Sequence, residues 1–176
     1  PEPQDEVVLT DYDPDGEIKI VAGALYAVSR LPDDQLLSIA RAMSTEERVS
    51  VLQTYVGNRT NRRHKPGRAF ERATYRFDVL SDYGAFRDLQ RHRLLTLEWP
   101  NLTPAHGFTE PAAIEEVGAL NDWQKVMTTT ADLYDTLITG GLERIASYAI
   151  SMAYRIRFYM QMNAREAMHL IELRSA

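Results

Sequence analysis

Hydrophobic positions along the chain fall into short periodic segments that are separated by polar turns. From residue 17 onward, apolar side chains recur every three or four positions, which predicts an amphipathic helix; they are Ile18, Val21, Ala22, Leu25 and Val28. From residue 74 to 79 apolar and polar side chains alternate, as in a half-buried strand of an antiparallel sheet. The chain therefore mixes helical and strand periods.

Capping residues predict where further helices begin. Ser44 is followed three residues later by Glu47, the pattern of a capping box, and Asn163 with Glu166 opens a last amphipathic helix that runs to Arg174. Asp33 is expected to cap a short helix, and Ser81 to cap one that buries Tyr83, Phe86 and Leu89.

Turn residues and short apolar runs complete the pattern. Strands are predicted at residues 7–10 and 94–99, and a long irregular connection at residues 100–111. Helices are predicted at 112–120 and 121–138, and Gly140-Gly141 separates them from a third helix carrying Leu142, Ile145, Ala149 and Met152. Residues 155–162 are compatible with either a helix end or a strand.

These elements predict an α+β fold with a small, mainly antiparallel sheet packed with helices, and with more helix than strand. A length of 176 residues is sufficient for one domain, expected to cover residues 1–176. With 44% hydrophobic and 26% charged residues, the composition is that of an ordinary globular protein. The sequence contains no signal peptide and no apolar run long enough to cross a membrane, so we expect a cytoplasmic protein without membrane partners.

The composition also excludes some chemistry. The chain has no cysteine, so disulfides, thiolate metal sites and a cysteine nucleophile are all excluded, and no metal site is expected. The net charge of −5 makes a general attraction to nucleic acid unfavourable.

Charge is distributed unevenly along the chain. Residues 1–17 contain seven acidic side chains and no basic one, whereas residues 59–72 contain six lysines and arginines, with His64, against a single acid, Glu71. This asymmetry suggests a local anion site. The alternatives are a solvated surface loop, which is the commoner explanation of a charge run, and a nucleic-acid contact, which the lack of interleaved aromatic residues disfavours.

The most prominent basic run is Arg91-His92-Arg93. The apolar residues Leu94, Leu95, Leu97 and Trp99 follow it directly, so the bases adjoin a segment expected to be buried. A cationic cluster anchored on a core suits rigid binding of an anion. The alternative is a solvated helix end, where cations interact favourably with the helix dipole.

Several short motifs together resemble a known family. Arg91-His92-Arg93, Asn163-Ala164-Arg165 and Glu172-Leu173-Arg174, together with Phe70-Glu71-Arg72, resemble the flavin-dependent thymidylate synthases, also called thymidylate synthase complementing proteins. Where this chain has Phe70-Glu71-Arg72, the family usually has Phe-Glu-His. The resemblance extends over most of the chain.

The family signature runs Arg-His-Arg-x-x-Ser-x-Asn-x-x-Ser-x-Arg-Tyr, and this chain follows it only in part. Thr96 takes the place of the first Ser, and then Glu98, Asn101, Thr103 and Pro104 take the places of Asn, Ser, Arg and Tyr. The lost Arg helps to bind the dUMP phosphate in the family. A second phosphate-binding Arg of the family falls near Ser147 here, where the only arginine nearby is Arg144. The resemblance thus implies a degenerate dUMP site.

The resemblance implies reductive methylation of dUMP to dTMP, a step of nucleotide biosynthesis, with methylenetetrahydrofolate as carbon donor and NADPH as reductant of FAD. It implies a homotetramer with FAD at the subunit interfaces, where residues of different subunits meet. The FAD contacts carried over are Arg91, His92, Arg93, Asn163, Arg165, His169 and Thr74. Arg174 and Asp88 are carried over as substrate contacts, and no catalytic base is identified.

An alternative function is a non-catalytic FAD- or nucleotide-binding or scaffolding domain of a larger homologue. The sequence begins with Pro1, which is not a natural start, and ends at Ala176, directly after Glu172-Leu173-Arg174, where relatives continue. We therefore expect that this sequence is a fragment of a longer chain.

Overall fold

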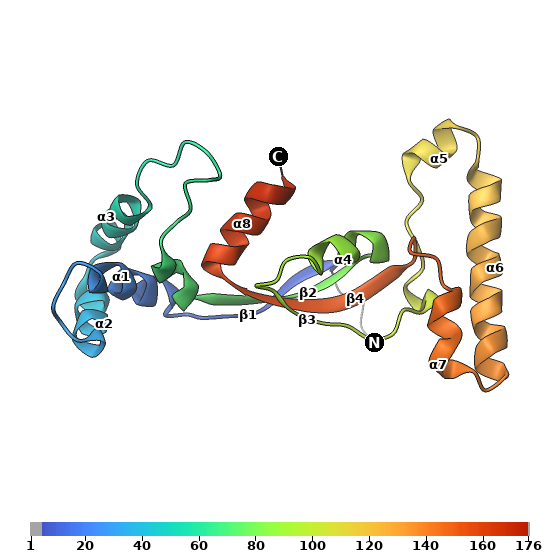
Figure 1. Ribbon diagram of the computed structural model, residues 1–176, viewed down its shortest axis with the longest axis horizontal. Helices are drawn as coiled ribbons and strands as arrows, with labels where there is room; N and C mark the ends of the chain where they lie inside the picture. Colours follow the sequence, from blue (N-terminus) through green and yellow to red (C-terminus); the bar gives the residue numbers. More distant parts are fainter. Residues whose placement is uncertain (1–4, 176) are drawn as a thin grey trace. The chain divides into compact units, whose positions relative to one another are not determined.

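The computed structural model describes residues 5–175 and has the predicted α+β architecture (Figure 1). Its strands are β1 (Val7–Tyr12), β2 (Thr74–Asp82), β3 (Thr96–Glu98) and β4 (Arg155–Asn163). Its helices are α1 (Gly16–Tyr26), α2 (Asp33–Ala42), α3 (Thr45–Val56), α4 (Tyr83–Leu89), α5 (Ala112–Glu116), α6 (Leu120–Thr139), α7 (Glu143–Ala146) and α8 (Ala164–Arg174). Short 3₁₀ turns form η1 (Arg68–Arg72), η2 (Pro104–His106) and η3 (Ser147–Ala149).

The four strands form one sheet in the order β1-β2-β4-β3. The amide of Asp13 donates to the carbonyl of Thr74 at 3.2 Å, at the end of β1 and the start of β2. The amide of Ala164 donates to the carbonyl of Ala73 at 2.9 Å, at the end of β4 and the start of β2. The central strand pairs are therefore antiparallel, as predicted.

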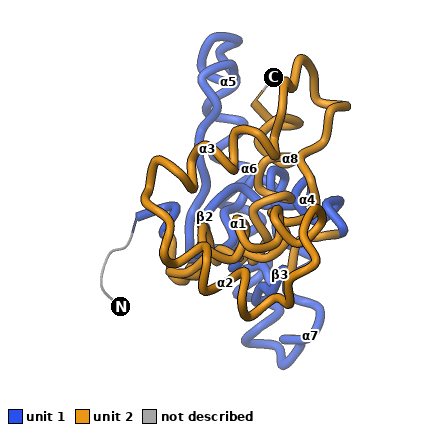
Figure 2. Tube along the Cα trace, turned by 90° about the vertical axis from the view of Figure 1, so that its left-hand side faces the viewer, with its two compact units in different colours: residues 1–8, 78–93, 97–159 blue, residues 9–77, 94–96, 160–176 orange. Residues whose placement is uncertain are grey.

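The chain divides into two compact units, shown in Figure 2. Unit 1 comprises residues 1–8, 78–93 and 97–159, and unit 2 comprises residues 9–77, 94–96 and 160–176. Strands β1, β2, β3 and β4 each contribute residues to both units. The expectation of a single domain stays a prediction.

The core of unit 2 forms where α1 packs between α2 and η1. Val21, Ala22, Leu36 and Ala40 make one buried cluster, while a second is built from Ile20, Ala24, Ala69, Phe70, Ala73 and Ala164. Small residues permit this close packing: a Cβ atom on Gly23 would lie 2.8 Å from Cδ of Arg72 and 3.1 Å from Cβ of Ala69. The capping box that opens α3 is present, because Ser44 Oγ accepts from the Glu47 amide and the Glu47 carboxylate accepts from the Ser44 amide.

The core of unit 1 is centred on Phe86 of α4, whose side chain is fully buried. Its ring centroid lies 4.5 Å from that of Phe158 on β4, 5.2 Å from that of Trp99 and 5.8 Å from that of Tyr83. These distances are typical of favourable tilted and edge-to-face aromatic contacts. The burial of Phe86 that the helical spacing predicted is confirmed.

Three predictions about element ends require correction. Helix α1 ends at Tyr26, so Val28 lies outside it and is 83% exposed. Asp33 is the first residue of α2 and does not cap it, because its carboxylate binds Arg72 of η1 at 2.7 Å. Ser81 belongs to β2, and Asp82 precedes α4 without a side-chain cap.

The segment after Gly141 also differs from the prediction. Its helix α7 is only four residues long and passes into η3 (Ser147–Ala149), with Met152 outside both. Residues 155–162, which the sequence left open between helix and strand, belong to β4, where buried Ile156 and Phe158 alternate with half-buried arginines. No helix among residues 5–175 is long and apolar enough to cross a membrane.

Replacing Phe86 by alanine should lower the free energy of unfolding by about 3–5 kcal/mol, because the change leaves a cavity among three aromatic rings. Chemical denaturation followed by circular dichroism measures this difference. Leu94→Ala, at a position that is 66% exposed, is the control and should change stability by less than about 0.5 kcal/mol. Equal losses for the two variants would contradict a core centred on Phe86.

Candidate functional site

The basic run Arg91-His92-Arg93 forms the turn that follows α4 in unit 1. The amide of Arg91 donates to the carbonyl of Asp88 and that of His92 to the carbonyl of Leu89, which closes the helix end. The His92 side chain is buried, whereas Arg91 is 80% exposed and Arg93 is exposed. The nearest carboxylate to Arg91 is that of Asp88, at 3.6 Å.

The residues after this run are less buried than the sequence predicted. Leu94 is 66% exposed and Trp99 is 45% exposed, so the expectation that both are buried is wrong for this chain. The two arginines match the alternative of a solvated helix end. Of the three side chains in this turn, only that of His92 is buried, so His92 alone anchors the turn to the core.

The second group of predicted cofactor residues lies around the start of α8 in unit 2. Asn163 caps this helix as predicted, because its Oδ1 accepts from the amide of Glu166 at 2.9 Å. Arg165 donates from Nε to the carbonyl of Pro66 and from Nη1 to Glu71, both at 2.9 Å. Thr74, the first residue of β2, is exposed, and so are His169 and Arg174.

Glu71 joins two parts of unit 2 that are distant in sequence, η1 and the start of α8. Its carboxylate accepts from Arg68 at 3.1 Å and from Arg165 at 2.9 Å. The Arg68 guanidinium holds the pKa of the Glu71 carboxyl below its ordinary value; partial burial opposes this shift, and Arg165 adds to it. The two guanidinium groups thus stabilise the ionised carboxylate.

The basic segment 59–72 is partly neutralised within the chain. Arg59 pairs with Glu172 of α8, Arg68 with Glu71, and Arg72 with Asp33. These three pairs remove much of the repulsion that would otherwise require a bound anion. Arg62, Arg63 and Lys65 remain exposed, as a solvated loop would have them.

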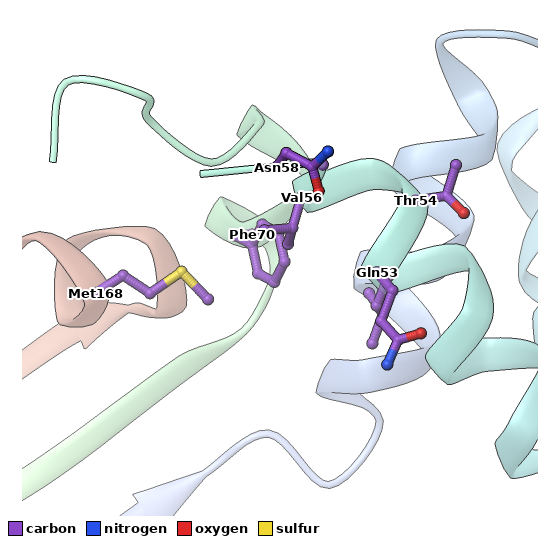
Figure 3. Close-up of a pocket in the computed structure, with 8 residues that line it drawn as sticks. Gln53, Thr54, Val56, Asn58, Phe70 and Met168 are labelled. Atoms are coloured by element: carbon purple, nitrogen blue, oxygen red, sulfur yellow. The ribbon is translucent and has the colours of Figure 1, made fainter. Parts of the chain in front are cut away.

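Unit 2 contains an open pocket of about 730 Å³, shown in Figure 3. Phe70 of η1 and Met168 of α8 line it, together with residues at the end of α3 such as Gln53, Val56 and Asn58. None of the cofactor residues predicted from the sequence lines this pocket. Its wall is largely apolar and includes no charged side chain.

Unit 1 contains a pocket of about 410 Å³ that we call the Arg144 pocket. It is lined by Arg144, Ser147 and Tyr148 from one stretch of the chain, and by Tyr83, Trp99 and Asn101 from others. Among residues 5–175, the guanidinium of Arg144 has no carboxylate partner. Arg144 is exposed, and a cation that lines a pocket together with amide and hydroxyl groups suits a phosphate or another small anion.

The Arg144 pocket contains two positions at which this chain departs from the family pattern. Asn101 is a departure from the signature, and Ser147 stands where the family has a phosphate-binding arginine. The structure places both in one pocket with Arg144. Tyr83 and Tyr148 were missed as pocket residues, because nothing in the sequence shows that α4 and η3 approach the same space.

A second pocket of about 410 Å³ in unit 1 is called the Glu98 pocket here. It is lined by Asp78, Glu98, Trp99, His106, Arg157 and Tyr159. Trp99 and Pro100 line both this pocket and the Arg144 pocket. Within the described part of the chain, no group of three His, Asp or Glu side chains could hold a metal ion.

The predicted site residues are therefore divided between the two units. Unit 1 contains Asp88, Arg91, His92 and Arg93, and unit 2 contains Thr74, Asn163, Arg165, His169 and Arg174. Within unit 2, Arg165 and Asn163 adjoin the basic segment through Pro66 and Glu71.

Residues 8–176 match the family model described as thymidylate synthase complementing protein. A UPF0159 protein of Chlamydia pneumoniae is 37% identical over 169 residues, covering 96% of this chain and 32% of that protein. A UPF0159 protein of Thermoplasma acidophilum is 38% identical over 141 residues, covering 80% of this chain and 28% of that protein. The chain thus spans about a third of the length of these curated relatives.

A solved structure has a similar fold. The UMP/dUMP methylase PolB from Streptomyces cacaoi, bound with 5-Br dUMP, superposes with a TM-score of 0.70 over 94% of this chain and 76% of that one, at 15% sequence identity.

Replacing Glu71 by glutamine should destabilise the protein most above pH 4.5, the ordinary pKa of a glutamate. Because the folded-state pKa of Glu71 is lowered, its stabilising contribution is present above that pH and is lost as the pH falls through the folded-state value. Urea denaturation of wild type and Glu71→Gln at several pH values measures the difference in free energy of unfolding. The difference should close in acid, and a constant difference would contradict the assignment. Arg68→Gln should reduce this effect more than Arg165→Gln.

Proposed function

This chain belongs to the thymidylate synthase complementing protein family, and we propose that it acts as an FAD-dependent thymidylate synthase that methylates dUMP. In this proposal methylenetetrahydrofolate gives the carbon and NADPH reduces the flavin. The observation that carries the nucleotide part of the proposal is the Arg144 pocket, where a guanidinium with no carboxylate partner among residues 5–175 shares the lining with the amide of Asn101 and the hydroxyl of Ser147. Arg144 then takes over the phosphate contact of the arginine that Thr103 replaces.

The donor chemistry of the predicted cofactor residues fits FAD. The guanidinium groups of Arg91 and Arg93 are exposed on either side of buried His92, and guanidinium groups bind pyrophosphate oxygens well. In unit 2, exposed Thr74 and His169 add polar groups near Arg165 and the Asn163 cap. FAD, when bound, supplies the hydride chemistry, which needs no cysteine nucleophile.

In this proposal the residues of the protein bind the cofactor and the substrate and orient them. Arg91, His92, Arg93, Asn163, Arg165, His169 and Thr74 hold the cofactor, and Arg174 and Asp88 contact the substrate. From the family resemblance, we propose that a homotetramer completes the sites with residues from different subunits. A cytoplasmic location belongs to the same proposal.

A second candidate function is a non-catalytic domain that binds FAD or nucleotide and supports assembly of a longer homologue. One observation favours it. Thr103, at the position of the lost arginine, has a local structural role: its Oγ1 accepts from the amide of Ala105 at 3.3 Å and caps η2. Pro104 is the first residue of that turn, so Thr103 and Pro104 both have a structural role in the local backbone.

The first test is the visible absorption spectrum of the purified protein after incubation with FAD and gel filtration. We expect a retained flavin spectrum that is lost on Arg91→Ala and on Arg165→Ala, since each change removes a pyrophosphate-binding cation. Arg30→Ala removes an exposed arginine outside the predicted site and should retain the flavin. An intact, oligomeric protein without flavin would favour the scaffolding function.

The second test is tritium release from labelled dUMP in the presence of methylenetetrahydrofolate, FAD and NADPH. We expect turnover, and we expect Arg144→Ala to raise the KM for dUMP by roughly tenfold to a hundredfold, as the loss of a charge-assisted hydrogen bond does. Arg87→Ala, an exposed arginine in α4, should leave the KM unchanged. Flavin binding without tritium release above background would reject the activity and leave the non-catalytic function.

A further inference from the structure

Strand β1 leaves one edge of the sheet open. The strand order β1-β2-β4-β3 puts β1 at the end of the sheet, so β2 pairs with one side of it, and no strand among residues 5–175 pairs with the other side. Peptide groups along a strand point alternately toward its two sides, so about half of those in β1 face the open edge. Such an edge offers hydrogen-bond donors and acceptors to another extended chain.

Strand β1 also exposes apolar side chains beside that edge. Val7 is 59% exposed, Leu9 is 48% exposed and Tyr12 is 58% exposed. Because side chains alternate along a strand, Val7 and Leu9 lie on one face of β1 and Tyr12 lies on the other. Lysine and proline commonly block pairing at the edge of a sheet, and β1 contains neither. The open edge therefore combines unused backbone groups with apolar surface that an added strand would cover.

The acidic charge around β1 is only partly neutralised within the chain. Residues 5–17 contain six acidic side chains, and four of them form ion pairs: Glu6 with Arg155, Asp13 with Lys19, Asp15 with Arg41, and Glu17 with Arg48. Among residues 5–175, the other two, Asp5 and Asp11, have no ion-pair partner. Asp5 precedes β1 by two residues, and Asp11 shares a face of the strand with Leu9. The two remaining acids thus flank Val7 and Leu9.

These two carboxylates are exposed and hydrated, so their effect is on the choice of partner. Pairing of two β1 strands, in either orientation, would bring acidic side chains of the two copies together, and like charges on opposite strands are destabilising. A strand with lysine or arginine at the corresponding positions would instead form favourable cross-strand pairs. Asp5 and Asp11 therefore disfavour a second copy of β1 and favour a basic partner by the same charges.

We propose that the open edge of β1 binds an extended segment of another protein, in which a lysine or arginine stands on each side of two alternating apolar residues. The segment adds to the sheet as a further strand. Backbone hydrogen bonds and the covering of Val7 and Leu9 supply the affinity, while pairing with Asp5 and Asp11 supplies the selectivity. This interaction uses neither the Arg144 pocket nor the predicted cofactor residues, so it does not depend on the proposed enzymatic activity.

Fluorescence anisotropy of a labelled synthetic peptide, titrated with the full chain, tests the proposal. The probe is Lys-Thr-Val-Thr-Val-Thr-Lys, whose lysines have the same spacing as Asp5 and Asp11. We expect saturable binding, and roughly tenfold weaker binding when glutamate replaces both lysines, because attraction becomes repulsion at two positions. N-methylation of alternate backbone amides tests strand addition directly. Methylation of the set that faces β1 should abolish binding, whereas methylation of the other set should leave it unchanged.

Charge-reversal variants of the protein test the selectivity. The double variant Asp5→Lys, Asp11→Lys should prefer the glutamate peptide to the lysine peptide by roughly tenfold. The control, Glu115→Lys with Glu116→Lys, makes the same change of net charge at exposed positions of α5 and should keep the original preference. Circular dichroism checks that each variant is folded, and the methylated peptides test the wild type without any substitution.

Four results would each overturn the proposal. They are no saturable binding of the lysine peptide, equal binding of the lysine and glutamate peptides, the same effect of both methylation patterns, and an unchanged preference in the folded double variant.

Discussion

The antiparallel pairing of β2 with β4 is the constraint on which the rest of the structure depends. These two strands are the central ones of the sheet, and each leads directly into a helix: α4, which the Arg91-His92-Arg93 turn follows, and α8, which begins within Asn163-Ala164-Arg165. In unit 1, α4 begins at Tyr83, whose amide donates to the carbonyl of Tyr154. In unit 2, α8 begins at Ala164, whose amide donates to the carbonyl of Ala73. A register slip of one residue would move every side chain of one strand to the other face and displace the helix that follows it.

Local signals in the sequence predicted the fold well where they had a local physical cause. Ser44 and Asn163 cap helices because their side chains reach an amide three residues away, and no distant contact is needed. Strand β2 follows from alternation alone. Predictions failed where distant contacts decided the outcome: Asp33 binds Arg72, 39 residues away, in place of its own helix end. The predicted helix after Gly141 was longer than the observed α7, because apolar residues at helical spacing do not show where an α-helix passes into a 3₁₀ turn.

For the candidate site, the sequence supplied residue types but not their availability. Arg72 belongs to a short motif, yet its guanidinium group is bound to Asp33 within the chain. Arg144, which belongs to no clear motif, has no carboxylate partner in the described chain and lines a pocket. A sequence pattern cannot distinguish these cases, since the distinction depends on carboxylates that only folding brings near.

Two pockets of unit 1, the Arg144 pocket and the Glu98 pocket, have opposite electrostatic character although they share Trp99 and Pro100. Within the described part of the chain, the charge without an ion-pair partner is the Arg144 guanidinium in one pocket and the Glu98 carboxylate in the other. An anionic group is therefore favoured on one side and disfavoured on the other, which gives each pocket selectivity through repulsion as well as attraction. The Phe86 ring that holds Trp99 in place consequently affects both pockets, and this couples the packing of the core to ligand binding. Loss of that contact would free the indole that lines both pockets.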